Sequence, residues 1–230
     1  MKKHIFWTGG FDSTFRLLQL IDDSCVSKIH IWYLALKIDN KSTSQVARMN
    51  RDHEITTMHK ILSQIDRSKI VKFNIIGESE KLLYYHLIFG YQFMNFISKE
   101  QIHFSDRTKA LFFDLWANNI VSRPISQWTA ITQILDDFDI EAEICLERGG
   151  GIWSRIKDWV VDGEIQFHQC PGLEALRRYQ IPLFDLDKED MLKIANQSQI
   201  EILRQTWSCW YPQDDSPCQL CFACLARPKF

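Results

Sequence analysis

The stretch KHIFWTGGFDST, residues 3–14, decides the fold of this chain. Its first five residues predict a short apolar strand, which Gly9 and Gly10 bring to an end. Asp12, Ser13 and Thr14 then favour the start of a helix. Apolar residues follow them at helical spacing: Phe15, Leu17, Leu18 and Ile21. The stretch therefore predicts a strand, a glycine loop and a helix in direct succession.

The rest of the chain repeats this alternation of strands and helices. Apolar runs predict further strands at 29–36, 70–76 and 141–146, and helices at 44–65, 80–96, 110–121, 127–135 and 192–197. Such an order predicts an α/β fold with a doubly wound, mostly parallel sheet. Ligands of these sheets bind at the carboxyl ends of the strands, near the point where the strand order reverses. The glycine loop after the first strand is the natural candidate.

Composition narrows the class of protein further. The chain has 230 residues, 46% hydrophobic and 24% charged, which is typical of a globular domain. Its 27 basic and 29 acidic side chains give a net charge of −2, so we expect no nucleic-acid partner held by a global positive field. No apolar stretch is long enough to span a membrane, and the N-terminus does not read as a signal peptide. We therefore expect a cytoplasmic protein without a membrane partner.

The glycine loop has the chemistry of an anion site. Gly9 and Gly10 allow the main chain to approach an anion closely, and the hydroxyls of Ser13 and Thr14 can bond phosphate oxygens. The start of the following helix adds N–H donors. A plainer alternative is a tight turn whose helix is capped by Asp12 or Ser13. A kinase-type loop is excluded, because it would need a Gly-Lys-Ser/Thr string, which the chain lacks.

Four of the seven cysteines crowd the end of the chain. Cys209, Cys218, Cys221 and Cys224 give the spacing C-x8-C-x2-C-x2-C, which can close a tetrahedron around Zn²⁺. Four thiolates also suit an iron–sulfur cluster, and four buried free thiols are the plain alternative. A closed four-sulfur zinc site has no open coordination position, so its role would be structural.

Both ends of the chain resemble one family, a member of the adenylating ATP pyrophosphatases. Residues 8–14 resemble the Ser-Gly-Gly-x-Asp-Ser pyrophosphate loop of adenylating ATP pyrophosphatases, with Thr8 in place of the first serine. The cysteines in the contexts TWSCW and PCQLCFACLAR, preceded by PLFDLDKEDM at 182–191, resemble the QueC family of 7-cyano-7-deazaguanine synthases. The resemblance implies an adenine nucleotide alpha hydrolase-like domain over 1–200. It also implies a zinc-binding segment, 201–230, packed on that domain.

The resemblance also implies an activity. QueC-like ligases use ATP and Mg²⁺ to adenylate the carboxylate of 7-carboxy-7-deazaguanine, and pyrophosphate is released. Ammonia then captures the acyl adenylate as an amide, which a second ATP-dependent step dehydrates to a nitrile. Carried over to this chain, the loop that handles pyrophosphate consists of Thr8, Gly9, Gly10, Asp12, Ser13 and Thr14. Asp12 and Ser13 are its catalytic candidates, and Asp12 would help to hold magnesium.

The middle of the chain departs from the family. Where the family has an Arg-Asn pair, this chain has SRPISQW at 122–128, and LERGGGIW at 146–153 replaces a Tyr-Pro-Asp-Cys stretch. We expect Arg123 to contact the nucleotide, and Gln127, Trp153 and Trp207 to contact the deazaguanine. A solvated arginine and core tryptophans are the alternatives.

The departures leave the amine acceptor open. Divergent QueC-like proteins occur in bacterial antiphage operons, where the activated deazaguanine can be joined to a protein amine, so the acceptor is either ammonia or a partner protein. A nucleotide-binding or partner-binding module without turnover and an ATP-dependent tRNA-modifying enzyme are rival hypotheses. A homodimer would fit the family, although no residue pattern here indicates one.

Overall fold

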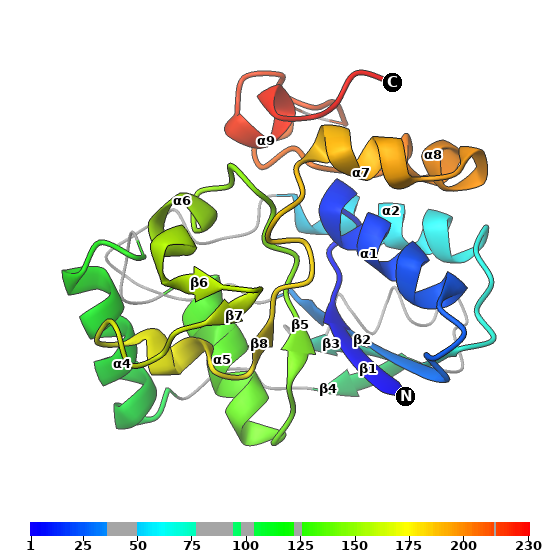
Figure 1. Ribbon diagram of the computed structural model, residues 1–230. Helices are drawn as coiled ribbons and strands as arrows, with labels where there is room; N and C mark the ends of the chain where they lie inside the picture. The colour runs from blue at the N-terminus through cyan, green and yellow to red at the C-terminus, as the bar shows by residue number, and fades with distance from the viewer. Residues whose placement is uncertain (36–49, 77–93, 98–103, 122–125, 214) are drawn as a thin grey trace.

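The computed structural model describes residues 1–35, 50–76, 94–97, 104–121, 126–213 and 215–230 (Figure 1). A six-stranded sheet in the order β4-β3-β2-β1-β5-β8 forms its centre, and all five pairs of neighbouring strands are parallel. The strands are β1 (Lys2–Phe6), β2 (Lys28–Leu34), β3 (Ile70–Ile76), β4 (Met94–Ile97), β5 (Ala142–Glu143) and β8 (Tyr179–Gln180). A small hairpin of β6 (Val160–Val161) and β7 (Glu164–Ile165) lies outside this sheet.

Helices cover both faces of the sheet (Figure 1). The longer ones are α1 (Phe11–Asp22), α2 (Arg51–Leu62), α4 (Asp106–Ala117) and α5 (Gln127–Asp137). The shorter ones are α6 (Trp153–Ile156), α7 (Lys188–Ile194), α8 (Gln197–Leu203), α9 (Phe222–Leu225) and the 3₁₀ turns η1 (Lys157–Trp159) and η2 (Leu173–Leu176). Figure 1 shows α7 and α8 beside α1, and α9 beyond them near the C-terminus.

The central strand shows why the sheet is wound on both sides. Ile5 and Trp7 are fully buried in a cluster with apolar residues of α1 and α2. Phe6, between them, points to the other face and joins a cluster with residues of α4 and α5. This alternation follows from the period of two along a strand. The predicted doubly wound, mostly parallel α/β fold is confirmed.

The strand order reverses at β1. This strand pairs with β2 on one side and with β5 on the other, although β5 comes much later in the chain. In open α/β sheets, such a reversal opens a crevice at the carboxyl ends of the strands. The loop that leaves β1, residues 7–10, therefore begins at the expected ligand position.

Two element predictions are wrong. The helix predicted at 80–96 lies largely outside the described residues, but Met94–Ile97 is a strand, because its main chain pairs with β3. The helix predicted at 192–197 crosses the end of one helix and the start of the next. Asn196 is the N-cap of α8, and its side chain accepts from the N–H of Gln199 at 3.0 Å. This N-cap begins a new helix at Gln197, whereas α7 ends at Ile194 with Ala195 as its C-cap.

The remaining elements agree with the predictions apart from their bounds. The helix predicted at 44–65 is observed as α2, and residues 44–49 lie outside the described residues. The helix predicted at 110–121 begins earlier, because the Ser105 side chain caps α4 at its start. The strand predicted at 141–146 is reduced to Ala142–Glu143. Among the residues that the structure describes, no helix has both the length and the apolar character needed to cross a bilayer.

One buried hydrogen bond joins the sheet to α2 and gives a test of the fold. The Tyr33 hydroxyl donates to Glu54 Oε2 at 2.7 Å. We expect Tyr33→Phe to lower the free energy of unfolding by about 1–3 kcal/mol, because it removes a donor from a buried carboxyl group. Urea denaturation measures this change. Tyr211→Phe is the control, because Tyr211 is exposed, and its stability should not change. Equal stability of Tyr33→Phe and the wild type would contradict the packing described.

Candidate functional site

The glycine loop is confined by α2. Gly9 has a φ of +70°, a conformation that side-chain-bearing residues rarely adopt. A Cβ at this position would lie 3.0 Å from Met58 Cγ and 3.2 Å from the carbonyl oxygen of Glu54. Both the dihedral angle and the space therefore require glycine here. The close approach fixes the course of the main chain from β1 into α1.

Two hydroxyl groups converge on this loop. Thr8 Oγ1 lies 3.4 Å from Ser13 Oγ, and it accepts from the N–H of Gly10 at 3.3 Å. The N-cap of α1 is Gly10, and no side chain caps the helix, so the alternative of a cap by Asp12 or Ser13 is wrong. The first N–H groups of α1 therefore remain without a side-chain cap. Together with the two hydroxyls, they form a donor set suited to an anion.

Thr14 takes a different role from the one expected. Its side chain is fully buried, and Thr14 Oγ1 accepts from Trp7 Nε1 at 2.9 Å. Its hydroxyl therefore contacts the core beneath the loop, because one helical turn carries this position to the inner face of α1. The Thr14 side chain therefore supports the loop from the core and does not face a phosphate, contrary to the prediction from the sequence.

A charged cluster lies beside the loop where three strands end. Lys188 Nζ is 3.4 Å from Asp12 Oδ1 and also forms an ion pair with Glu147 Oε1. Asp12 follows β1, Glu147 follows β5 and Lys188 follows β8. All three side chains are largely shielded from solvent. The sequence analysis missed Glu147 and Lys188 as site residues. Glu147 lies in 146–153 and Lys188 in 182–191, and no spacing in either segment marks these residues as site residues.

The cluster changes the protonation of Asp12. Burial is the main cause that raises the pKa of Asp12; the Lys188 ammonium lowers this pKa and the Glu147 carboxylate raises it, and the net pKa is about 8. Asp12 Oδ1 and Glu147 Oε2 are buried oxygens without a hydrogen-bond partner. The Lys188 ammonium thus lies between two shielded carboxyl groups. A bound phosphate would attract the ammonium, and a bound divalent cation would attract the carboxyl oxygens.

Arg148 connects the two segments that carry Glu147 and Lys188. Its guanidinium group bonds Asp187 Oδ2 at 2.6 Å and also pairs with Asp190. Its main-chain N–H donates to the carbonyl of Leu186 at 2.8 Å. These contacts join the segment after β5 to the start of α7, the helix that carries Lys188. The contacts of Arg148 therefore position Glu147 and Lys188 relative to each other.

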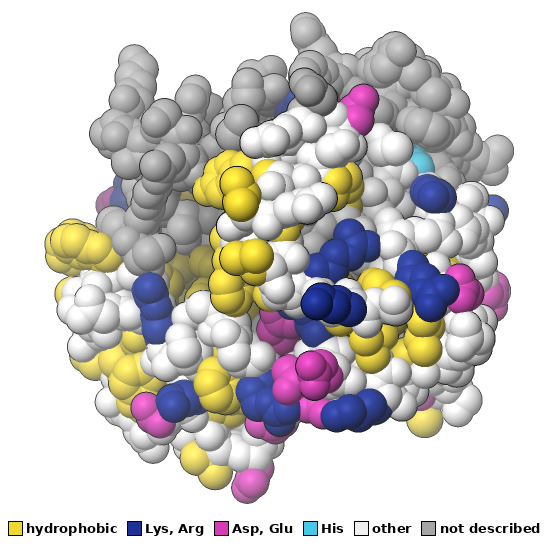
Figure 2. Space-filling view, turned by 90° about the horizontal axis from the view of Figure 1, so that it is seen from above, with side chains coloured by type: hydrophobic (Ala, Val, Ile, Leu, Met, Phe, Trp, Pro, Cys, Tyr) yellow, Lys and Arg dark blue, Asp and Glu magenta, His cyan; other side chains and the backbone are white. Residues whose placement is uncertain are grey.

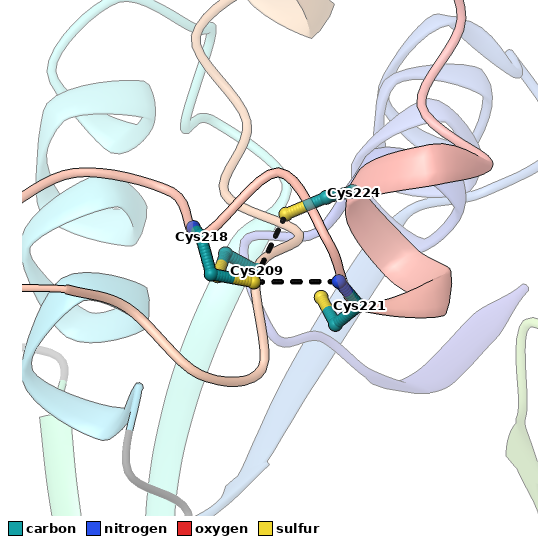
Figure 3. Close-up of side chains that lie close together, drawn as sticks. All are labelled: Cys209, Cys218, Cys221 and Cys224. Atoms are coloured by element: carbon teal, nitrogen blue, oxygen red, sulfur yellow. Dashed lines mark hydrogen bonds between the residues drawn. The ribbon is translucent and has the colours of Figure 1, made fainter.

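The four clustered cysteines form a candidate metal centre (Figure 3). Their sulfur atoms all lie within 4.8 Å of one another. Cys218 N–H donates to Cys209 Sγ at 3.2 Å, and Cys221 N–H donates to Cys218 Sγ at 3.4 Å. Amide donors of this kind stabilise thiolates, and main-chain N–H groups of Leu220 and Cys221 lower the pKa of Cys218 to about 6. The donor set fits a tetrahedral Zn²⁺ site of structural type.

The other predicted contact residues have varied surroundings. Trp207 stacks on His53, with ring centroids 4.4 Å apart and an interplanar angle of 11°, so one face of its indole is already covered. Trp153 packs on Phe184, at 5.9 Å between ring centroids, and its Nε1 is buried without a hydrogen-bond partner. Gln127 is the first residue of α5. Arg123 lies outside the described residues.

The fold and site define an α/β protein with a glycine loop at the switch point and a tetrathiol centre after α8. In a comparison with known families, residues 174–229 match the model of the queuosine biosynthesis protein QueC. The matched segment contains Lys188 and the four cysteines. The predicted resemblance to the QueC family is therefore confirmed over this segment, which is about a quarter of the chain. No curated protein and no solved structure matches the chain.

Metal analysis tests the tetrathiol centre. We expect the purified protein to contain about one zinc ion per chain, because four thiolates at this spacing bind Zn²⁺ tightly. Elemental mass spectrometry should show that the Cys221→Ser variant has lost most of the zinc. Cys25→Ser is the matched control, because Cys25 is exposed and lies outside the cluster. Folded wild-type protein without zinc, or full zinc retention in Cys221→Ser, would contradict the assignment.

The pKa of Asp12 predicts how stability depends on pH. Its pKa is raised from 3.8 to about 8 in the folded state, so between these values the folded protein holds a proton that the unfolded chain has lost. The free energy of unfolding should therefore fall as pH rises from about 4 to 8. Asp12→Asn should remove much of this slope in urea denaturation without magnesium or nucleotide. Parallel pH profiles of the two proteins would show that Asp12 does not titrate as described.

Proposed function

We propose that the protein activates the carboxylate of a 7-deazaguanine with ATP and transfers the acyl group to an amine. The observation that carries this proposal is the donor set at the end of β1, which adjoins a shielded lysine supplied by the QueC-like segment. The match to QueC supports an ATP-dependent role like that of 7-cyano-7-deazaguanine synthase. It also supports a deazaguanine as the substrate class.

The chemistry would proceed in two transfers. A carboxylate oxygen attacks the α-phosphorus of ATP, the bond to the bridging oxygen breaks, and pyrophosphate leaves. The amine nitrogen then attacks the acyl carbon, the bond to AMP breaks, and the nitrogen loses a proton. Neither step needs a dedicated nucleophile on the protein, so positioning and charge stabilisation would supply most of the acceleration.

The residues around the glycine loop divide this work. The main chain of Gly9 and Gly10 and the hydroxyls of Thr8 and Ser13 would hold the β- and γ-phosphates. Lys188 would leave its carboxyl partners and neutralise the charge that develops on the leaving pyrophosphate. Mg²⁺, when bound, would neutralise phosphate oxygens, and the Asp12 carboxylate is the oxygen ligand we propose for it.

The deazaguanine and the acceptor complete the proposal. Trp207 is half-buried and stacks on His53, and we propose that a purine-like ring also stacks on its indole; Trp153 has an unpartnered indole N–H. We keep these two residues, with Gln127, as proposed substrate contacts, and Arg123 as a proposed nucleotide contact. The acceptor is ammonia or an amine of a partner protein, the latter in an antiphage setting.

Pyrophosphate release tests the loop. With ATP, Mg²⁺ and 7-carboxy-7-deazaguanine, we expect release that falls about 10²–10³-fold in Ser13→Ala, because a donor to the leaving group is lost. Ser63→Ala is the control, because Ser63 is an exposed serine at the end of α2. Unchanged pyrophosphate release by Ser13→Ala would contradict the assignment of the loop to pyrophosphate. Mass spectrometry of the products separates the acceptors, since an amide or nitrile indicates ammonia and a mass shift on a protein indicates a protein amine.

A further inference from the structure

The segment before the cysteines contacts the glycine loop directly. The main-chain N–H of Trp207 donates to the carbonyl oxygen of Gly9 at 3.0 Å. On the same side, a Cβ added at Gly10 would lie 3.6 Å from the Trp207 carbonyl oxygen. The loop is therefore held between α2 on one side and the main chain of Trp207 on the other.

Trp207 is in turn fixed by its side chain. Its indole stacks on His53 of α2, and Trp207 Nε1 donates to the carbonyl oxygen of Cys209 at 3.0 Å. Cys209 is the first of the four clustered thiols, and it is almost fully buried. A short chain of contacts thus runs from the thiol cluster through Trp207 to Gly9.

The segment that carries the thiols has little apolar core of its own. After α8, the regular structure of its described residues is the single turn of α9 and one bridge between Gln213 and Ser216. Figure 2 views the molecule from above, and apolar side chains gather on the surface that it shows. The exposed large apolar residues of the segment are Trp210, Tyr211, Leu220, Phe222, Leu225 and Phe230. A segment that buries so little depends on its metal for order.

We infer that metal at the four cysteines holds the glycine loop in its binding conformation, with Trp207 as the positioning residue between them. This inference rests on the proposed function only for the identity of the ligand. If the loop binds nucleotide, coupling is reciprocal: bound nucleotide makes the metal harder to remove, and bound metal makes nucleotide bind more tightly.

Hydrogen exchange tests the positioning without any nucleotide. In zinc-loaded protein, Trp207→Leu should raise amide exchange across residues 8–14 about 5-fold or more, while zinc content stays unchanged, because the loop opens more often. Trp210→Leu is the matched control: it removes an exposed tryptophan of the same segment, and loop exchange should stay at the wild-type level. If Trp207→Leu fails to fold, His53→Ala removes the stacking partner instead. Equal loop exchange in the Trp207 or His53 variant and in the control would overturn the inference.

Zinc release tests the coupling. We expect α,β-methylene-ATP with Mg²⁺ to slow the transfer of zinc to a chromogenic chelator about 5-fold or more in wild type, and not in Trp207→Leu. Nucleotide that binds without slowing zinc release would overturn the inference and leave the proposed function intact. Loop exchange that depends on Trp207 in a protein that binds no nucleotide would support the positioning role and contradict the proposed function.

Discussion

The close contact between Gly9 and α2 is the constraint on which the rest of the site depends. There is no room for a side chain between the loop and Met58, and the positive φ turns the chain sharply from β1 into α1. Because of that turn, the first N–H groups of α1 and the hydroxyls of Thr8 and Ser13 lie together at the switch point of the sheet. A side chain at Gly9 would displace either α2 or the loop, and it would separate the donors that make this end of the sheet a candidate anion site.

The second constraint is the placement of charge. Lys188 lies between Asp12 and Glu147 at a shielded position, where every electrostatic interaction is stronger than in water. An isolated ammonium group would be costly here, and two isolated carboxylates would be costlier. Burial keeps Asp12 protonated near neutral pH, which reduces the repulsion from Glu147. In the proposed function, an arriving phosphate would offer Lys188 a stronger partner and would free the carboxyl oxygens of Asp12 and Glu147 for a cation.

Sequence reasoning located the parts of the site whose residues are close along the chain. The glycine loop is continuous, and the four cysteines lie so near one another that the chain must bring their thiols together. It did not locate Glu147 and Lys188, because they meet Asp12 only through the order of the strands, which no local pattern specifies. It assigned Thr14 to the ligand because the motif is read as a string, whereas the helical turn after Gly10 directs that hydroxyl towards Trp7. The strand at 94–97 was missed for a similar reason, since only pairing with β3 distinguishes it from an apolar helix end.

The most direct test of the proposed activity follows one oxygen atom. If 7-carboxy-7-deazaguanine labelled with ¹⁸O in its carboxylate is incubated with the protein, ATP, Mg²⁺ and an amine, adenylation transfers one carboxylate oxygen to the α-phosphorus. The account predicts that mass spectrometry finds AMP carrying one ¹⁸O, released together with unlabelled pyrophosphate. Unlabelled AMP, or ADP with ¹⁸O in inorganic phosphate, would contradict attack of the carboxylate on the α-phosphorus and with it the proposed reaction.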